Sequence, residues 1–214
     1  MKITWIGHAC FLIEGKNVTV MTDPYDEHIP YKAPSFPADV VTVSHEHFDH
    51  NAVDRVLGSP AVVRGSGKHT AHGVKFTGIA TFHDQEQGKK RGENTIFTFA
   101  VDGINIAHFG DLGHSLSPKQ IAQLSQVEVV MIPVGGYFTI DAAQAADIVG
   151  QLPHVKVFLP MHYKTDVLGT DFPIDTVDKF ASRMQNVREI GSAEVSINHN
   201  DLPEHPEVWI LNYA

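Results

Sequence analysis

Short apolar runs alternate with polar or glycine-containing breaks along the chain. The first three runs, at residues 2–6, 10–14 and 17–22, predict the strands of an antiparallel meander. The meander is expected to end at Thr22-Asp23-Pro24-Tyr25, because proline cannot donate a hydrogen bond to a strand ladder. Residues 26–38 contain three prolines and no regular pattern, which predicts a long loop of the kind that often carries function.

The rest of the chain alternates predicted strands with a few helices. Asp102-Gly103 is a hairpin turn signal, Ser117-Pro118 and Asp141 begin helices, and Gly150 is expected to end the second of them. The strands are predicted at residues 39–43, 60–64, 73–82, 94–101, 104–109, 127–132, 155–159, 187–190, 194–198 and 207–212, and the helices at 51–57, 117–124, 141–149 and 174–184. This order, without a linker or low-complexity segment, predicts a single α/β domain over residues 1–214 with two sheets packed face to face and helices outside.

The composition, with 43% hydrophobic and 19% charged residues, is that of a globular protein. A net charge of −9 provides no basic surface for nucleic acid, so a small-molecule substrate is the expected partner. Cys10 is the single cysteine, which excludes an intrachain disulfide. The first residues are too few and too polar for a signal-peptide core, and no apolar window is long enough to span a membrane. These features predict a cytoplasmic protein and leave its oligomeric state open.

The densest chemistry lies in residues 44–51, Ser-His-Glu-His-Phe-Asp-His-Asn, directly after the predicted strand at 39–43. Imidazole nitrogens and carboxylate oxygens are the ligands that zinc and neighbouring metals accept. His45 and His47 are placed to reach one ion, and Asp49 and His50 to reach a second. An exposed, histidine-rich loop is the alternative, but it gives no reason for this spacing.

Three more candidate ligands each follow the end of a predicted strand, where layered α/β folds gather their sites. They are His83, Asp111 and His162. We therefore expect His45, His47 and His83 to bind one ion, and Asp49, His50 and His162 the other, with Asp111 as the bridge. In the resulting reaction Asp111 fixes the spacing of the ions, a hydroxide shared by the ions attacks, and Asp49 takes up its proton.

Other residues have two interpretations each. Asp23 is either the acceptor for a ligating imidazole or the start of a turn before Pro24. His8 is either part of the site wall or a hydrogen-bonded turn residue. His108 is close to Asp111 in sequence, but the strand-end position of His83 makes His83 the preferred ligand, and His108 is expected to pack or to hydrogen-bond behind the ligands.

Three residues are candidates for contact with the substrate. His114 follows Asp111 closely, with an exposed position at the start of a helix as the alternative. Tyr137 and Tyr163, the latter next to Lys164, are candidates to bind an anionic substrate, and each is equally consistent with a surface residue.

These motifs resemble the metallo-β-lactamase superfamily of metal-dependent hydrolases. The closest likeness is to its small bacterial members, which include the ascorbate-6-phosphate lactonase group, and the chain is also similar to the phosphodiesterase that cleaves N-acyl-phosphatidylethanolamine. The resemblance implies a four-layer αβ/βα sandwich that binds two divalent ions, expected to be Zn²⁺ with Mn²⁺ or iron as alternatives. It runs through Trp5-Ile6-Gly7-His8, Thr22-Asp23-Pro24, His45 to His50, Phe82-His83, Gly110-Asp111, Ile132 to Gly136 and Pro160-Met161-His162-Tyr163.

Departures from the superfamily's patterns narrow the expected activity. The zinc β-lactamases have a cysteine ligand where this chain has Asp111, and the oxygen-reducing di-iron members have a glutamate where it has His47. Nuclease members usually carry an added RNA-binding domain, for which 214 residues leave no room. The leading hypothesis is hydrolysis of a small-molecule ester, lactone or phosphodiester. The alternatives are an iron-dependent oxidoreductase, a phosphodiesterase acting on nucleic acid or lipid, and a metal-binding scaffold without activity.

Overall fold

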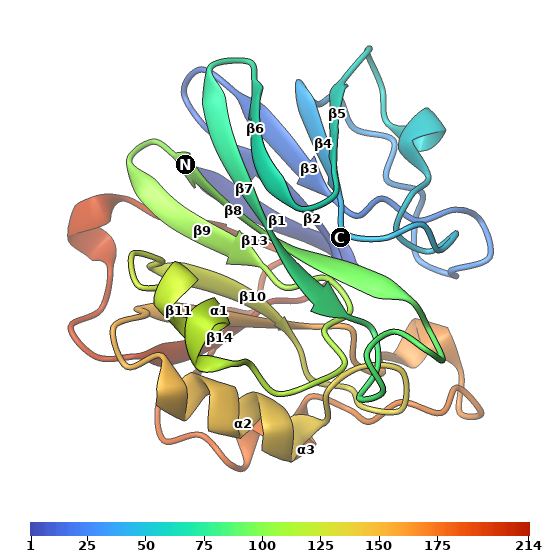
Figure 1. Cartoon of the computed structure of the whole chain (residues 1–214), viewed down its shortest axis with the longest axis vertical. Helices are drawn as coiled ribbons and strands as arrows, with labels where there is room; N and C mark the ends of the chain where they lie inside the picture. Colours follow the sequence, from blue (N-terminus) through green and yellow to red (C-terminus); the bar gives the residue numbers. More distant parts are fainter.

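The computed structural model of the chain describes residues 1–214 and contains two β-sheets (Figure 1). The first sheet has six strands in the order β13-β1-β2-β3-β4-β5, and the second has eight in the order β12-β14-β11-β10-β9-β8-β7-β6. The strands of the first sheet are β1 (Lys2–Gly7), β2 (Cys10–Glu14), β3 (Thr19–Thr22), β4 (Val40–Val43), β5 (Ala61–Arg64) and β13 (Glu194–Ser196). Those of the second are β6 (Gly67–Ala71), β7 (Val74–Phe82), β8 (Glu93–Val101), β9 (Ile104–His108), β10 (Val129–Pro133), β11 (Val157–Met161), β12 (Val187–Glu189) and β14 (Glu207–Ile210).

The predicted meander is confirmed: β1 pairs with β2, and β2 with β3, both antiparallel. Because side chains alternate along a strand, β2 directs Phe11 and Ile13 into the core between the sheets and Cys10 and Leu12 to the opposite face. Both faces of this sheet are therefore buried at its central strands β2, β3 and β4. This explains why its strands read as nearly continuous apolar runs instead of alternating apolar and polar positions.

The predicted hairpin at Asp102-Gly103 is also confirmed. Val101 of β8 pairs with Ile104 of β9, and the two turn residues have φ angles of 51° and 83°. Positive φ at both central positions is what a two-residue turn of this type needs, and aspartate followed by glycine adopts it at low cost.

Two predicted helices are confirmed, and each begins at a side-chain cap. Ser117 caps α1 (Pro118–Gln123) and Asp141 caps α2 (Ala142–Gln151), each as part of a capping box. The prediction that Gly150 ends α2 is wrong, because the helix continues to Gln151. Its last turn is held by Leu152, which is fully buried, and the chain leaves the helix before Pro153.

Two predicted helices need correction, and one strand was not predicted. The predicted helix at 51–57 is only a 3₁₀ turn, η1 (Val53–Arg55), and the one at 174–184 shrinks to α3 (Asp178–Ala181). Neither has a side-chain cap at its start, so neither gains the hydrogen bond that favours initiation. Strand β6 was not predicted, because its sequence Gly-Lys-His-Thr-Ala is polar. It is an edge strand held by backbone pairing to β7, and polar side chains suit such an edge.

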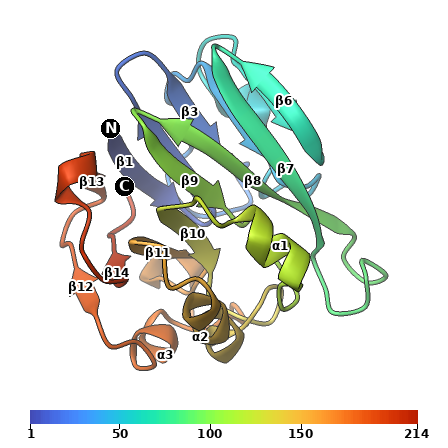
Figure 2. The same ribbon diagram turned by 60° about the vertical axis from the view of Figure 1, so that its left-hand side comes forward.

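The helices are distributed unevenly around the two sheets. Helices α1, α2 and α3 cover the outer face of the eight-stranded sheet around β9 to β11 (Figure 2). The outer face of the six-stranded sheet is covered by a smaller apolar cluster, in which Tyr25, Ile29 and Tyr31 from the proline-rich loop pack against the sheet. The expected α/β sandwich is thus confirmed, with loops and a 3₁₀ turn in place of α-helices in one outer layer. No helix has both the length and the apolar character needed to cross a membrane.

Candidate metal centre

The candidate ligands meet because several strands end at the same place. Strands β9, β10 and β11 are parallel, and β7 has the same direction because it is separated from β9 by two antiparallel pairings. The residues that follow β7, β9 and β11 therefore emerge at one edge of the sheet, and these residues are His83, Asp111 and His162. Strand β4 of the facing sheet delivers residues 44–50 to the same edge.

The histidines form two groups of three, in each of which the potential ligand atoms lie within 4.8 Å of one another. We call His45, His47 and His83 the His45 trio, and His8, His50 and His162 the His50 trio. The His45 trio has the membership expected from the sequence. The His50 trio contains two of the three expected residues, but His8 lies where Asp49 was expected.

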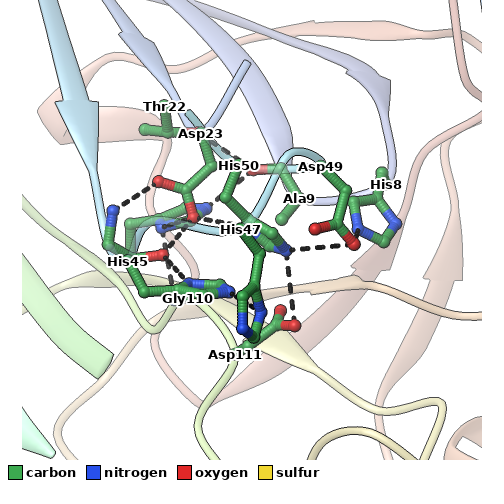
Figure 3. A network of polar contacts seen from close by, with 12 residues as sticks. His8, Ala9, Thr22, Asp23, His45, His47, Asp49, His50, Gly110 and Asp111 are labelled. Atoms are coloured by element: carbon green, nitrogen blue, oxygen red, sulfur yellow. Dashed lines mark hydrogen bonds and ion pairs between the residues drawn. The ribbon is translucent and has the colours of Figure 1, made fainter. Parts of the chain in front are cut away.

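Asp49 remains beside the His50 trio and contacts it through a carboxylate oxygen. Its Oδ2 atom accepts a hydrogen bond from His8 Nε2 at 3.2 Å and lies 3.9 Å from His50 Nε2. Figure 3 shows the His50 ring between the carboxylates of Asp49 and Asp111. The sequence left the role of His8 open. In the structure it is a buried member of the cluster that holds Asp49 in place.

Asp111 lies between the two trios. Its Oδ2 atom is 3.0 Å from His83 Nε2 of the His45 trio, and 3.3 Å from both His50 Nε2 and His162 Nε2 of the His50 trio. The carboxylate is buried, and its Oδ1 atom has no hydrogen-bond partner. One carboxylate thus faces histidines of both groups, as the sequence predicted for Asp111.

Asp23 connects the backs of the two trios through a buried network. Its Oδ1 atom accepts the Ser44 amide at 2.8 Å, and its Oδ2 atom accepts both the Ser44 hydroxyl and His50 Nδ1, the latter at 2.8 Å. Since the Ser44 hydroxyl donates to Asp23, its oxygen accepts from His45 Nδ1, at 2.9 Å. Of the two interpretations of Asp23, the acceptor for a ligating imidazole is therefore the one found. The His45 imidazole is fixed in the tautomer with its proton on Nδ1, and the His50 ring is held so that its Nε2 points toward Asp111.

The turns that carry these side chains have unusual backbone conformations. His8, Asp23 and His162 have φ angles of 53°, 38° and 52°, a region that residues other than glycine rarely adopt. Such strain persists where surrounding contacts enforce it, which is typical of functional sites. Glycines also allow close packing behind two ligands. A Cβ atom on Gly113 would lie 2.3 Å from the His83 carbonyl carbon, and one on Gly135 would lie 2.2 Å from the His162 oxygen.

Asn94 is a site residue that the sequence did not reveal. Its buried side chain accepts the Asp111 amide at 3.0 Å and donates to the Phe109 carbonyl at 2.9 Å, so it fixes the turn that presents Asp111. Nothing in the sequence around Asn94 distinguishes it from other polar residues in a strand, because its partners are distant along the chain.

The electrostatics of the cluster favour bound cations. Burial, and next the nearby His50, lowers the pKa of His45 to about 2, while burial and His162 lower the pKa of His8 to about 4. Both imidazoles are therefore neutral near pH 7, with lone pairs available. Burial opposes ionisation of Asp111, but the charges of His162, His50 and His83 outweigh it and hold the pKa of this carboxyl well below its usual range.

The residues present fit the binding of metal ions. Five buried polar atoms of the cluster have no hydrogen-bond partner, namely His8 Nδ1, His50 Nε2, His83 Nδ1, His162 Nδ1 and Asp111 Oδ1. Buried polar atoms are normally paired, so such a concentration indicates a missing ligand. Neutral imidazole and ionised carboxylate are the donors that divalent transition metals prefer.

Four of the remaining candidates lie outside the ligand set. His108 is fully buried and bonds the Ala9 carbonyl through Nε2 at 2.8 Å, in the packing role expected for it. The three residues predicted to contact the substrate have other surroundings. His114 accepts the Phe82 amide, Tyr163 is buried with its hydroxyl directed at the Leu211 carbonyl, and Tyr137 is 65% exposed. None of these three lines the cavity over the centre.

The loop that follows His83 is organised by one carboxylate. Asp84 accepts the backbone N–H groups of Glu86, Gly88, Lys90 and Arg91 at 2.7–2.9 Å. Burial raises the pKa of Asp84, but the four hydrogen bonds lower it by more than burial raises it. The resulting pKa is about 2. Because folding lowers the pKa of Asp84, its ionised carboxylate stabilises the folded protein fully above about pH 4. This stabilisation is lost as the pH falls through about 2.

We expect Asp84→Ala to speed hydrogen exchange at those four amides near pH 7, with no change in the β8–β9 hairpin. Glu86→Ala is the matched control, because it removes an exposed ion pair with Lys90 but no backbone acceptor. Equal protection of the four amides in Asp84→Ala and wild type would contradict this account. An NMR titration of the Asp84 carboxyl carbon tests the pKa.

Comparison with known proteins places this geometry in a family. Residues 2–162 match the family model of the beta-lactamase superfamily domain. A protein of Archaeoglobus fulgidus described as a UPF0173 metal-dependent hydrolase is 30% identical, over 82% of this chain and 88% of its own length. A protein of Thermoplasma volcanium with the same description is 31% identical, over 80% of this chain and 87% of its own length.

A solved structure agrees over the full length. A Thermotoga maritima protein, provisionally described as a zinc-dependent hydrolase of the metallo-beta-lactamase superfamily, has 36% identity and a TM-score of 0.82, covering 100% of this chain and 99% of its own. The family match includes the turns that carry His8, Asp23, Asp111 and the cluster from His45 to His50. The chain therefore belongs to the metallo-β-lactamase superfamily, among the proteins described as UPF0173 metal-dependent hydrolases.

Proposed function

We propose that this protein hydrolyses an ester, lactone or phosphodiester bond of a small molecule with the help of two divalent metal ions. The observation that carries the proposal is the position of Asp111, whose single carboxylate faces His83 on one side and His50 and His162 on the other. A carboxylate can offer oxygen to two ions at once, whereas an imidazole cannot. The His45 trio would hold one ion, and His50 and His162, with Asp49 or His8, the second.

Two ions bound here would act as Lewis acids and would make water a nucleophile at neutral pH. The protein's own groups supply the rest of the chemistry. Asp49 is ionised, because His50 and His8 lower its pKa against the opposing effect of burial. Its carboxylate lines the cavity and is partly exposed, so it can take the proton from the attacking water. His8 donates to Asp49 Oδ2 and thereby orients the other oxygen for this task.

Metal analysis of the purified protein, combined with a panel of chromogenic esters, lactones and phosphodiesters, tests the proposal. We expect two divalent ions per chain and turnover of one of these bond types. Protein that retains no metal and shows no turnover after addition of Zn²⁺ or Mn²⁺ would overturn it. Iron with substrate-dependent oxygen consumption, and no hydrolysis, would favour the oxidoreductase alternative.

Removal of the metal provides a second measurement on the same preparation. Dialysis against a chelator is expected to reduce hydrolysis to background, and addition of one metal at a time should restore it. The chelated protein should also unfold at a lower temperature, since ligands that bind only the native state stabilise it. Full activity in protein shown by mass spectrometry to be metal-free would contradict the proposed role of the ions.

A further inference from the structure

A cavity of about 430 Å³ opens over the metal centre. Six side chains of the cluster face it, including Asp49 and Asp111. Around them stands an apolar wall of Ile29, Phe48, Phe138 and Phe172. Pockets that bind small molecules combine apolar side chains with polar groups that fix the orientation of the ligand. This cavity has both, with the four apolar side chains beside the polar side chains of the cluster.

The apolar wall is partly aromatic and open to solvent. The rings of Phe138 and Phe172 lie 6.1 Å apart, and Phe48 is 53% exposed with its ring 5.6 Å from that of His28. Exposed aromatic side chains at the mouth of a cavity are typical of a surface that binds an apolar group. The wall therefore favours a substrate with a hydrophobic body over a fully polar one such as a sugar.

One cation beside this wall, Arg91, has no acidic partner in the protein. The Arg91 guanidinium lies over the Phe138 ring, 5.4 Å from its centre, and forms no ion pair or side-chain hydrogen bond. The neighbouring Lys90 is paired with Glu86, and Arg55 and Arg64 are paired with glutamates on the surface. In a chain with a net charge of −9, a cation left free beside the candidate active site is notable. A guanidinium has five N–H donors that suit carboxylate or phosphate oxygens.

Arg91 is also held at a defined position. Its backbone amide is one of the four that Asp84 accepts, at 2.8 Å, and the Gly92 amide donates to the Gly88 carbonyl at 3.0 Å. The loop is joined to the metal centre because the His83 amide donates to the Gly92 carbonyl at 3.0 Å. A guanidinium on a fixed loop loses less entropy when it binds an anion than one on a mobile loop.

We infer that Arg91 selects substrates in which a hydrophobic body carries an anionic group, a carboxylate or phosphate, apart from the bond that is hydrolysed. This inference rests on the proposed function. The separation follows from the position of the guanidinium, which packs on Phe138 and forms no hydrogen bond or ion pair with the candidate metal ligands. The reacting bond would lie at Asp111 and Asp49, the hydrophobic body along Phe138 and Phe172, and the anion at Arg91.

Binding of two matched fluorescent probes to the purified, metal-containing protein tests the inference without turnover. Anilinonaphthalene sulfonate is anionic, and N-phenylnaphthylamine has the same rings without the sulfonate. We expect Arg91→Met, which keeps the apolar contact with Phe138, to weaken binding of the sulfonate about tenfold and to leave the neutral probe unchanged. Arg91→Lys should retain part of the affinity. Displacement of the sulfonate by phenylpropionate or by phenylpropylphosphonate shows whether a carboxylate or a phosphate group is preferred.

Arg183→Met is the matched control, because Arg183 also has no acidic partner and lines a different cavity, beside Met184 and Val208. An unchanged affinity for the sulfonate in Arg91→Met, an equal loss for both probes, or loss of the sulfonate preference in Arg183→Met would overturn the inference.

Kinetics with para-nitrophenyl hexanoate and mono-para-nitrophenyl adipate give the corresponding catalytic result. Arg91→Met should raise KM about tenfold for the adipate only, with kcat retained. Absence of hydrolysis of every ester, lactone and phosphodiester in the panel, with charge-selective binding intact, would reject the proposed function and leave the binding result standing, so the two failures can be told apart.

Discussion

Replacement of Asp111 by alanine is expected to abolish turnover while the protein stays folded. The Asp111 carboxylate faces both histidine trios through one oxygen atom, at 3.0–3.3 Å from three imidazole nitrogens. Without it the two proposed ions would lose their shared ligand, and His83, His50 and His162 lose their common anionic partner. The loss should exceed the roughly 10–100-fold that removal of a group behind a metal ligand costs. Metal content should fall from two ions per chain to one or none.

Asp111→Asn separates charge from size in the same experiment. It keeps the shape of the side chain and an oxygen, but an amide offers a weaker ligand than a carboxylate, so it should lose most of the activity as well. Circular dichroism should confirm that both variants retain their sheets, since Asn94 holds the turn through the Asp111 backbone and not through its side chain. Turnover at the wild-type rate in a folded, metal-analysed Asp111→Ala protein would contradict the proposed function.

The parts of the fold that follow from local chemistry could be predicted from the sequence. The meander, the Asp102-Gly103 turn and the capped starts of α1 and α2 depend on residues that are neighbours in sequence. Strand β6 could not be predicted, since only its pairing with β7 makes a strand of a polar segment. The loop layer over the six-stranded sheet also depends on distant contacts, such as that of Tyr31 with Thr165.

In the candidate metal centre, too, features that depend on neighbouring residues were predictable, and those that depend on distant contacts were not. The spacing of His45 to His50 and the strand-end positions of His83, Asp111 and His162 predicted that these residues lie together, and the structure places them in one cluster. The position of His8 within the His50 trio was not predictable, because it depends on a strained turn after β1. Arg91 and Phe138 were missed for a similar reason. Their side chains pack together from segments that are distant in sequence. Neither residue has a sequence neighbour that indicates a place in a binding site.

Replacement of Asp23 by alanine is expected to have the second-largest effect, although Asp23 lies behind the ligands. Its carboxylate accepts His50 Nδ1 directly and orders His45 through the Ser44 hydroxyl, so a single group orients one ligand in each trio. Loss of this control should weaken metal binding and activity about 10–100-fold. It should also destabilise the protein by about 3–5 kcal/mol, because His50 and Ser44 are left buried without their common acceptor.

Titration of the metal into chelated protein and urea unfolding measure the two effects separately. Asp23→Asn keeps the size of the side chain, but its NH₂ group cannot accept from His50 Nδ1 or from the Ser44 hydroxyl, so it should lose metal affinity nearly as much as alanine. Asp39→Asn is the matched control, because Asp39 caps the Thr19 amide in the same sheet, at 2.8 Å, but contacts no ligand. If Asp23→Asn bound both ions with wild-type affinity, the network in Figure 3 would have a role in folding alone, and orientation of the imidazoles would have to come from the strained backbone that carries them.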